Sequence, residues 1–141
     1  MLSEFRFVHP IEIRFGDMDA IGHVNNAVYL TYLESARIAY WLHVTRRTGI
    51  EALDMILART EIDYRSPAVY GESLDVGVRV ESMRRSSFTM RFEVVEHRTR
   101  RLVAEAKKVL VHYDHKTKST HALPDALKQL ILAHDPGARQ E

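Results

Sequence analysis

The sequence predicts an α+β domain in which one antiparallel sheet wraps around a single long central helix. Two observations lead to this expectation: a long segment with helical spacing near the amino end, and later segments in which apolar and polar residues alternate. The chain has 141 residues, enough for one domain with a sizeable core. We expect that domain to span residues 1–141, with residues 135–141 as a frayed tail.

Composition and charge narrow the possible function classes. Apolar residues make up 45% of the chain and charged residues 28%, which is typical of a globular protein. The formal net charge of +1 gives no support for a nucleic-acid partner. Because the chain has no cysteine, disulfides, zinc–thiolate sites and a cysteine nucleophile are excluded. With no secretory signal and no apolar run of about 20 residues, we expect a cytoplasmic protein with no membrane partner.

The first two elements are an extended strand and the long helix. The strand should cover residues 5–15, and Pro10 places it at an edge or a bulge because proline cannot donate to a ladder. The helix should run from about Ala27 to about Arg47, where apolar residues recur at helical spacing. Its surface is apolar over most of the circumference, which indicates that the helix is enclosed.

Four strands in a meander should follow, and then a short helix. Alternation predicts strands over residues 57–65, 74–80, 88–94 and 102–113. In the last strand the apolar parity changes at Lys107 and Lys108, which predicts a β-bulge. A short amphipathic helix should begin after Pro124. One sheet around one helix leaves the outer side of the sheet uncovered, so we expect a homodimer or homotetramer.

The stretch FGDMDAIGHVNNAVYLTYLESAR, residues 15–37, crowds polar side chains against the head of the helix. Gly22 permits a sharp turn, and Asn25 and Asn26 suit a helix amino terminus. Such a terminus presents free backbone N–H groups and the positive end of the helix dipole, which can form an oxyanion hole. Asp19 could then act as a general base for water or as a nucleophile, which together describes an acyl-transfer site.

Other chemistries fit this stretch less well. The segment DMDAIG begins like a calcium loop, but Ile21 and Val28 stand where oxygen ligands are required. Asp17, Asp19 and His23 could hold a metal, yet no further ligand is evident, so we expect none. No G-x-S-x-G elbow is present for a serine nucleophile. An aspartate before a helix is also often only a cap, and His23 with Asp19 could serve a hydratase or dehydratase.

On these residues the chain resembles hotdog-fold acyl-CoA thioesterases of the 4-hydroxybenzoyl-CoA thioesterase type. Its GHVNN motif is most similar to bacterial acyl-CoA thioesterases. The resemblance implies a hotdog fold, hydrolysis of an acyl-CoA to free acid and coenzyme A, and no cofactor. It also implies that Asp19 is the catalytic carboxylate and that the Asn26 backbone N–H polarises the thioester carbonyl. His23 would orient water or stabilise the loop.

The resemblance further suggests what the substrate contacts. Here HVNN replaces the apolar and aromatic side chains of the 4-hydroxybenzoyl type, so an aliphatic or aryl-aliphatic acyl group is expected. Asn25 is a cap or a site residue, and Tyr29 a packing residue whose hydroxyl could reach the acyl pocket. Glu34 is a reserve acid, because a second hotdog thioesterase group uses an acid on this helix. An ion pair between Glu34 and Arg37 is the alternative. Three further residues could line an acyl tunnel or simply the core: Trp41, Met55 and Leu57.

A second motif, MRRSSF, resembles the segment in which this family binds the phosphates of coenzyme A. Arg84 and Arg85 would grip phosphate oxygens, with Ser86 and Ser87 as further donors. At a turn between strands they could reach the ligand of a partner subunit, so we expect the site at a subunit interface. A basic turn in solvent is the alternative. A protein that only binds acyl-CoA would keep these arginines and need no Asp19. A second basic turn, at Arg98, Arg100 and Arg101, could extend the basic surface formed by Arg84 and Arg85.

Overall fold

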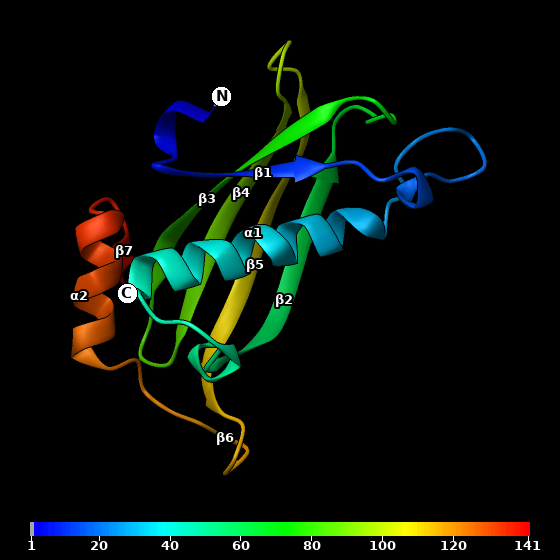
Figure 1. Ribbon diagram of the computed structural model, residues 1–141. Coiled ribbons are helices and arrows are strands. Elements are labelled where there is room, and N and C mark those ends of the chain that lie inside the picture. The colour runs from blue at the N-terminus through cyan, green and yellow to red at the C-terminus, as the bar shows by residue number, and fades with distance from the viewer. Residues whose placement is uncertain (1) are drawn as a thin grey trace.

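A computed structural model describes residues 2–141 and confirms the expected hotdog fold, an antiparallel sheet curled around one long helix (Figure 1). The helices are α1 (Val28–Thr45) and α2 (Asp125–His134), with short 3-10 turns at Leu2–Glu4, Phe15–Asp17 and Ile50–Ala52. The strands are β1 (Phe7–Glu12), β2 (Met55–Tyr64), β3 (Ser73–Met83), β4 (Ser87–Glu96), β5 (Leu102–Asp114), β6 (Ser119–Thr120) and β7 (Arg139–Gln140).

Helix α1 lies in the concave face of the sheet and forms the centre of the core. Trp41 stacks on Phe88 of β4 with ring centroids 5.1 Å apart, and its indole N–H donates to the Ala52 carbonyl oxygen at 2.8 Å. Burying a ring such as that of Phe88 stabilises the fold by about 1.5–3 kcal/mol. Arg46, at φ 56°, ends the helix before the expected stop. None of the helices in residues 2–141 is long and apolar enough to cross a membrane.

The sheet order is β1-β3-β4-β5-β2, so the expected four-strand meander is only partly right. Strands β3, β4 and β5 form a meander, but β2 pairs with β5 and lies at the edge. The side of β3 that a meander would give to β2 is taken by β1, with Pro10 opposite Asp75. Strand β1 is therefore the other edge of this five-strand path, which agrees with its proline.

The β-bulge expected at Lys107 and Lys108 is wrong. Both residues pair in register with β2 and β4, and the register shifts lie instead between Leu57 and Arg59 and between Val94 and Val95. The alternation of β5 continues through Lys108, whose side chain points inward and is only 3% exposed. Because this inward position holds a lysine, the apolar residues, read from the sequence alone, change from one face of the strand to the other.

The two faces of the sheet differ in what they leave exposed. Helix α1 packs chiefly on β1 and β3, so the inner face of β2 keeps Leu57 45% exposed and Tyr64 47% exposed. The outer face instead carries charge pairs, such as Lys107 with Glu81 at 3.2 Å. Apolar surface therefore lacks cover on the inner face of the β2 edge, in addition to the outer side of the sheet, where Val8 is 42% and Ile56 43% exposed.

The prediction of a frayed tail over residues 135–141 is wrong. The buried Asp135 carboxylate accepts hydrogen bonds from the Tyr40 hydroxyl and, at 3.0 Å, from the Val80 N–H. Strand β7 then pairs with the end of β3, and the Glu141 N–H donates to the Met83 carbonyl oxygen at 2.8 Å. An acid placed directly after α2 thus fixes the carboxyl end to the core.

Replacing Tyr40 with phenylalanine should lower the free energy of unfolding by about 1–3 kcal/mol, because the buried Asp135 loses a donor. Burial, followed by the charge of Asp135, raises the pKa of Tyr40 and keeps this donor protonated. Urea unfolding checks the change. Tyr70→Phe is the control, since that ring is 58% exposed, and it should change stability by less than about 0.5 kcal/mol. Equal effects of both variants would contradict the role of Tyr40.

Candidate active site

The loop that leads into α1 is anchored by the buried side chain of Asp17. Its Oδ2 accepts the Tyr32 hydroxyl at 2.6 Å and the Arg14 N–H at 3.0 Å, and its Oδ1 accepts the Arg14 guanidinium at 3.1 Å. Burial acts to raise the pKa of Asp17, but the hydrogen bonds from Tyr32 and Arg14 outweigh it and hold the pKa below its usual value. These bonds fix the loop to the first turns of α1 and give Asp17 a structural role.

Asp19 lies in a tight turn two residues further on. Its Oδ1 accepts the N–H groups of Ile21 at 2.9 Å and His23 at 3.3 Å, while its own N–H donates to the His23 carbonyl oxygen at 2.8 Å. Gly22 makes the turn possible with a φ of +86°. The other carboxylate oxygen, Oδ2, has no hydrogen-bond partner within residues 2–141. One oxygen of Asp19 therefore holds the loop, and the other is available.

The backbone N–H of Asn26 is open at the head of α1. The Asn25 side chain accepts the Ala27 N–H at 2.9 Å, and the Asn25 carbonyl oxygen accepts the Val28 N–H at 2.9 Å, so Asn25 acts as a cap. The exposed Asn26 donates no backbone hydrogen bond to any residue that the structure describes. Its carbonyl oxygen accepts the Tyr64 hydroxyl at 3.0 Å. The Asn26 N–H is thus free at the positive end of the helix dipole.

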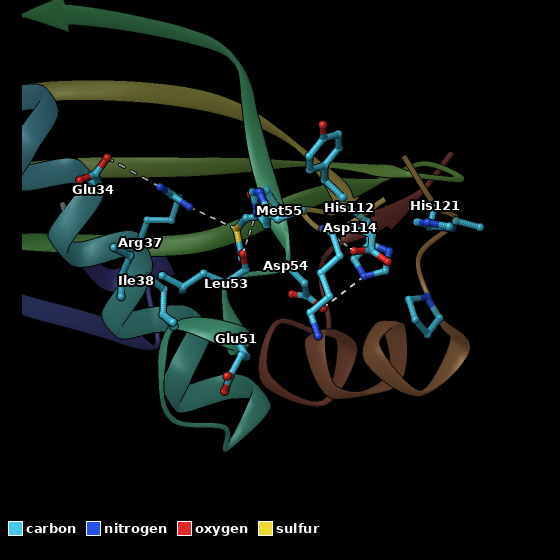
Figure 2. Close-up of a pocket in the computed structure, with 16 residues that line it drawn as sticks. Glu34, Arg37, Ile38, Glu51, Leu53, Asp54, Met55, His112, Asp114 and His121 are labelled. Carbon is cyan, nitrogen blue, oxygen red and sulfur yellow. Dashed lines mark hydrogen bonds and ion pairs between the residues drawn. The ribbon is translucent and has the colours of Figure 1, made fainter. Parts of the chain in front are cut away.

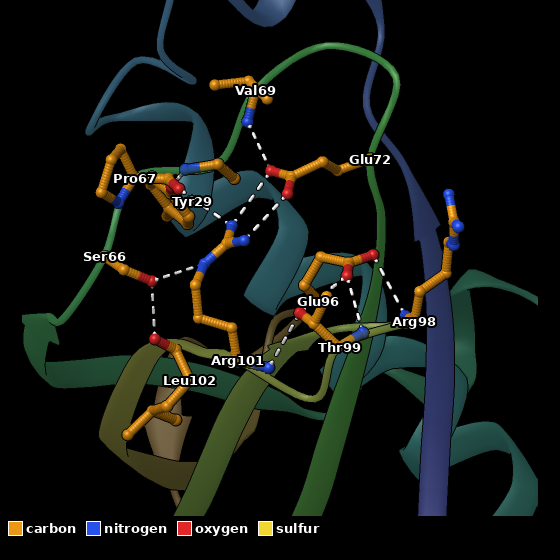
Figure 3. A network of polar contacts seen from close by, with 11 residues as sticks. Tyr29, Ser66, Pro67, Val69, Glu72, Glu96, Arg98, Thr99, Arg101 and Leu102 are labelled. Atoms are coloured by element: carbon orange, nitrogen blue, oxygen red, sulfur yellow. Dashed lines mark hydrogen bonds and ion pairs between the residues drawn. The ribbon is translucent and has the colours of Figure 1, made fainter.

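A network around Arg101 supports this loop from the sheet (Figure 3). The Arg101 guanidinium contacts both oxygens of Glu72 at 2.9 and 3.0 Å and also reaches Ser66 and the Pro67 carbonyl oxygen. Its hydrogen bonds hold the pKa of Glu72 below the usual value. The neighbouring Ala68 accepts the Val24 N–H at 2.9 Å. Arg101 therefore braces the wall behind the Asp19 loop.

Tyr29 belongs to the same wall. Its ring is 3% exposed and packs edge-on against Tyr32 and Tyr64, and its hydroxyl accepts the Ala68 N–H at 3.3 Å. These contacts are those of a packing residue, the first of the two roles expected for it.

Arg84 and Arg85 are exposed on the turn between β3 and β4, at the opposite end of the sheet from Asp19. Strand β4 alone spans roughly 30 Å between these ends. One protomer therefore does not bring the two motifs together. Arg84 lies 3.6 Å from Glu141, and the Ser86 carbonyl oxygen accepts the His112 N–H at 2.8 Å. Ser87 begins β4.

The hairpin tip with Arg98, Arg100 and Arg101 lies at the Asp19 end, so it does not extend the Arg84–Arg85 turn. Two of its arginines already have carboxylate partners, because the Arg100 Nη1 lies 3.1 Å from Asp75 and Arg101 binds Glu72.

A cavity of about 1090 Å³ opens beside the second half of α1 (Figure 2). Its walls come from α1, from the start of β2 and from the end of β5, and include Arg37, Ile38, Leu53, Met55 and His112. Glu34 also lines it, with its side chain 61% exposed and Oε2 4.0 Å from the Arg37 Nη2. Of the suggested tunnel residues Met55 lines the cavity, whereas Trp41 is fully buried in the core. No single motif marks this cavity, because it is assembled from segments far apart in the sequence.

No group of three or more His, Asp or Glu side chains among residues 2–141 is arranged to hold a metal ion. Of the three residues considered for one, Asp17 is already engaged by Tyr32 and Arg14.

Asp17→Asn should reduce stability near neutral pH and flatten its acid dependence. A carboxyl whose pKa is lowered by folding contributes fully above its unfolded value of about 3.9, and this contribution is lost as pH falls through the folded pKa. Urea unfolding between about pH 3 and pH 6 should therefore show a steeper acid loss for the wild type than for the variant. Asp63→Asn, at a side chain 72% exposed, should keep the wild-type slope. Identical slopes for all three proteins would contradict the anchoring role of Asp17.

The family model described as "Thioesterase-like superfamily" matches residues 13–131. A thioesterase from Thermus thermophilus, solved in complex with coenzyme A and Zn, is 34% identical with a TM-score of 0.83, covering 94% of this chain and 97% of its own.

Two curated relatives are more distant in sequence. The long-chain acyl-CoA thioesterase FadM of Escherichia coli (strain K12) is 27% identical over 126 residues, which span 86% of this chain and 93% of FadM. The uncharacterized protein YsmA of Bacillus subtilis (strain 168) is 26% identical over 90 residues, which span 64% of this chain and 61% of YsmA.

Proposed function

The chain belongs to the thioesterase-like superfamily, a family of thioester hydrolases, and from that premise we propose that it hydrolyses acyl-CoA thioesters. The proposal takes support from FadM, a long-chain acyl-CoA thioesterase, and from the Thermus thermophilus thioesterase that binds coenzyme A. Within the family we place the chain with the 4-hydroxybenzoyl-CoA thioesterase type, because its acid precedes the helix. The GHVNN segment favours an aliphatic or aryl-aliphatic acyl group.

The observation that carries this proposal is that one short loop before α1 holds two groups without a hydrogen-bond partner among residues 2–141, the Asp19 Oδ2 and the Asn26 N–H. The thioester carbonyl oxygen accepts the Asn26 N–H, and each such donor is worth about 3–4 kcal/mol in the transition state. Either the Asp19 Oδ2 takes a proton from a water molecule that attacks the carbonyl carbon, or it attacks that carbon itself to form an anhydride, which water then hydrolyses to the free acid. In both routes the C–S bond breaks and the thiolate of coenzyme A leaves. His23, bound to Asp19 through both backbone groups, holds the loop in place.

We further propose that the complete site is shared between two protomers that pair along β2. Antiparallel self-pairing of β2 sets its Met55 end against the Tyr64 end of the second copy, and Tyr64 binds the Asn26 carbonyl oxygen at 3.0 Å. The cavity and the Arg84–Arg85 turn of one protomer then face the Asp19 loop of the other. This arrangement explains how two motifs at opposite ends of the sheet serve one coenzyme A thioester.

Asp19→Asn should lower kcat for acyl-CoA hydrolysis by about 10²–10⁴-fold. Asparagine keeps the oxygen that accepts the Ile21 and His23 N–H groups, so the loop retains its shape while the basic oxygen is lost. A thiol reagent that detects released coenzyme A measures the rate over a panel of acyl chains. Glu12→Gln, at an exposed residue of the opposite edge strand β1, is the matched control and should keep wild-type turnover. Full activity in Asp19→Asn would remove Asp19 from the mechanism.

Leu57→Lys should convert the dimer to monomers and strongly reduce turnover. A charge on the uncovered inner face of β2 is tolerated in the protomer, where Leu57 is 45% exposed, but not in an apolar contact. Val8→Lys, at a residue 42% exposed on the opposite edge strand, should leave both properties unchanged. Light scattering gives the mass and the coenzyme A assay gives the rate. A dimeric, fully active Leu57→Lys would place the contact elsewhere.

A further inference from the structure

Two cations lie between α1 and β5 without a close anionic partner. The Arg37 side chain is 11% exposed, its Nη1 lies 3.2 Å from the Met55 sulfur, and its Nη2 is 4.0 Å from Glu34 (Figure 2). The buried Arg37 Nε has no hydrogen-bond partner in the part of the chain that the structure describes. A thioether is a weak acceptor, so this guanidinium lacks a good oxygen partner.

Lys108 lies behind Arg37 on the inner face of β5. It is 3% exposed, and its Nζ sits 6.0 Å above the Phe92 ring, with no ion pair to any residue in 2–141. Burial, and then the charge of Arg37, lowers the pKa of Lys108. Burial likewise lowers the pKa of Arg37. An arginine stays charged nevertheless, so at least one desolvated positive charge persists here.

Buried charges normally occur with a hydrogen-bonded counter-charge, because desolvation is costly. The one nearby carboxylate, on Glu34, is mostly exposed and stands 4.0 Å away. An acceptor from outside the chain would therefore offset the desolvation free energy of the Arg37 guanidinium. Arg37 lines the cavity, so a ligand in the cavity can supply that acceptor.

The remaining cavity wall favours an apolar ligand with one anionic end. Ile38, Leu53 and Met55 give it apolar surface. Asp54 is held by His112 at 3.2 Å and Arg47 at 3.3 Å. Asp114 accepts the backbone N–H of Lys116 at 2.8 Å and that of Thr117. Both acids therefore have a cationic or N–H partner, although the Asp54 Oδ1 itself has none within residues 2–141, and a further acid of the wall, Glu51, is exposed to solvent. The charge of Arg37 has no carboxylate nearby except Glu34.

We propose that Arg37, backed by Lys108, binds a carboxylate at the far end of the acyl chain, so that the preferred substrates are ω-carboxyacyl-CoA thioesters. This inference rests on the proposed thioesterase function and names its substrate class. Arg37 lies nine residues beyond Val28, the first residue of α1, which is about 14 Å along the helix. The carboxylate therefore binds away from the helix head of its own protomer, in the cavity that faces the Asp19 loop of the second copy, and takes no part in the chemistry.

The test compares matched acyl-CoA pairs of equal length, with and without an ω-carboxylate, from about six to about twelve carbons. The carboxylated member should have the higher kcat/KM by about ten- to a hundredfold at the best length. Arg37→Met should bring this ratio close to one, and Arg37→Lys should restore part of it. Lys107→Met, on the opposite face of the same strand with its side chain 44% exposed, should keep the wild-type ratio.

A binding measurement separates this inference from the proposed function. Calorimetry of the free protein with dicarboxylates and monocarboxylates of equal length should show tighter binding of the dicarboxylate, lost in Arg37→Met. If no acyl-CoA is hydrolysed but this difference persists, the thioesterase proposal fails and the anion site stands. If hydrolysis is rapid but the ω-carboxylate gives no advantage in rate or binding, the inference is overturned alone. It is also overturned if Glu34→Gln and Arg37→Met both dissociate the dimer, since Glu34 of a second copy would then be the partner of Arg37.

Discussion

The candidate site depends on one buried contact, the 2.6 Å hydrogen bond from the Tyr32 hydroxyl to Asp17. Tyr32 lies on the buried side of α1, and Asp17 lies two residues before Asp19. The contact therefore holds the polar loop that contains Asp19 against the rigid core. The Arg101 network holds the same loop from the sheet, through Ala68. With the loop fixed from two sides, the fold itself holds the two groups that the proposed mechanism uses, the Asp19 Oδ2 and the Asn26 N–H.

The topology separates the two parts of the candidate site, one for the reaction at the thioester and one for binding the coenzyme A thioester. The acid and the helix head lie at one end of the sheet, whereas the large cavity and the Arg84–Arg85 turn lie at the other. Strand β2 lies along an open edge between them, with apolar side chains that α1 does not cover. An exposed edge of this kind is normally paired or protected in native proteins. Pairing with a second copy would give the backbone groups of this edge hydrogen-bond partners. It would also bring the two halves of the site together.

Much of this could be predicted from the sequence where a local pattern determines the structure. The periodicity of α1 and the alternation of the strands indicated the fold, and the Asp19–Asn26 spacing indicated the open helix head. The failures have identifiable causes. A bulge was predicted in β5 because Lys108 places a charge where an apolar residue would continue the alternation. A frayed tail was predicted because its anchor, Asp135, binds Tyr40 of α1, which is far away in the sequence. The edge position of β2 and the cavity beside Arg37 depend on long-range pairing, which no short segment encodes.

The proposed mechanism depends on the head of α1, where the Asn26 N–H would polarise the thioester carbonyl. The most direct measurement is the infrared stretch of a ¹³C-labelled thioester carbonyl bound to Asp19→Asn, which keeps the loop geometry and turns over slowly. A hydrogen bond at the positive end of the helix should shift this stretch to lower frequency than that of the same acyl-CoA free in solution. An unshifted or higher frequency in the bound complex would show that the Asn26 N–H does not polarise the carbonyl.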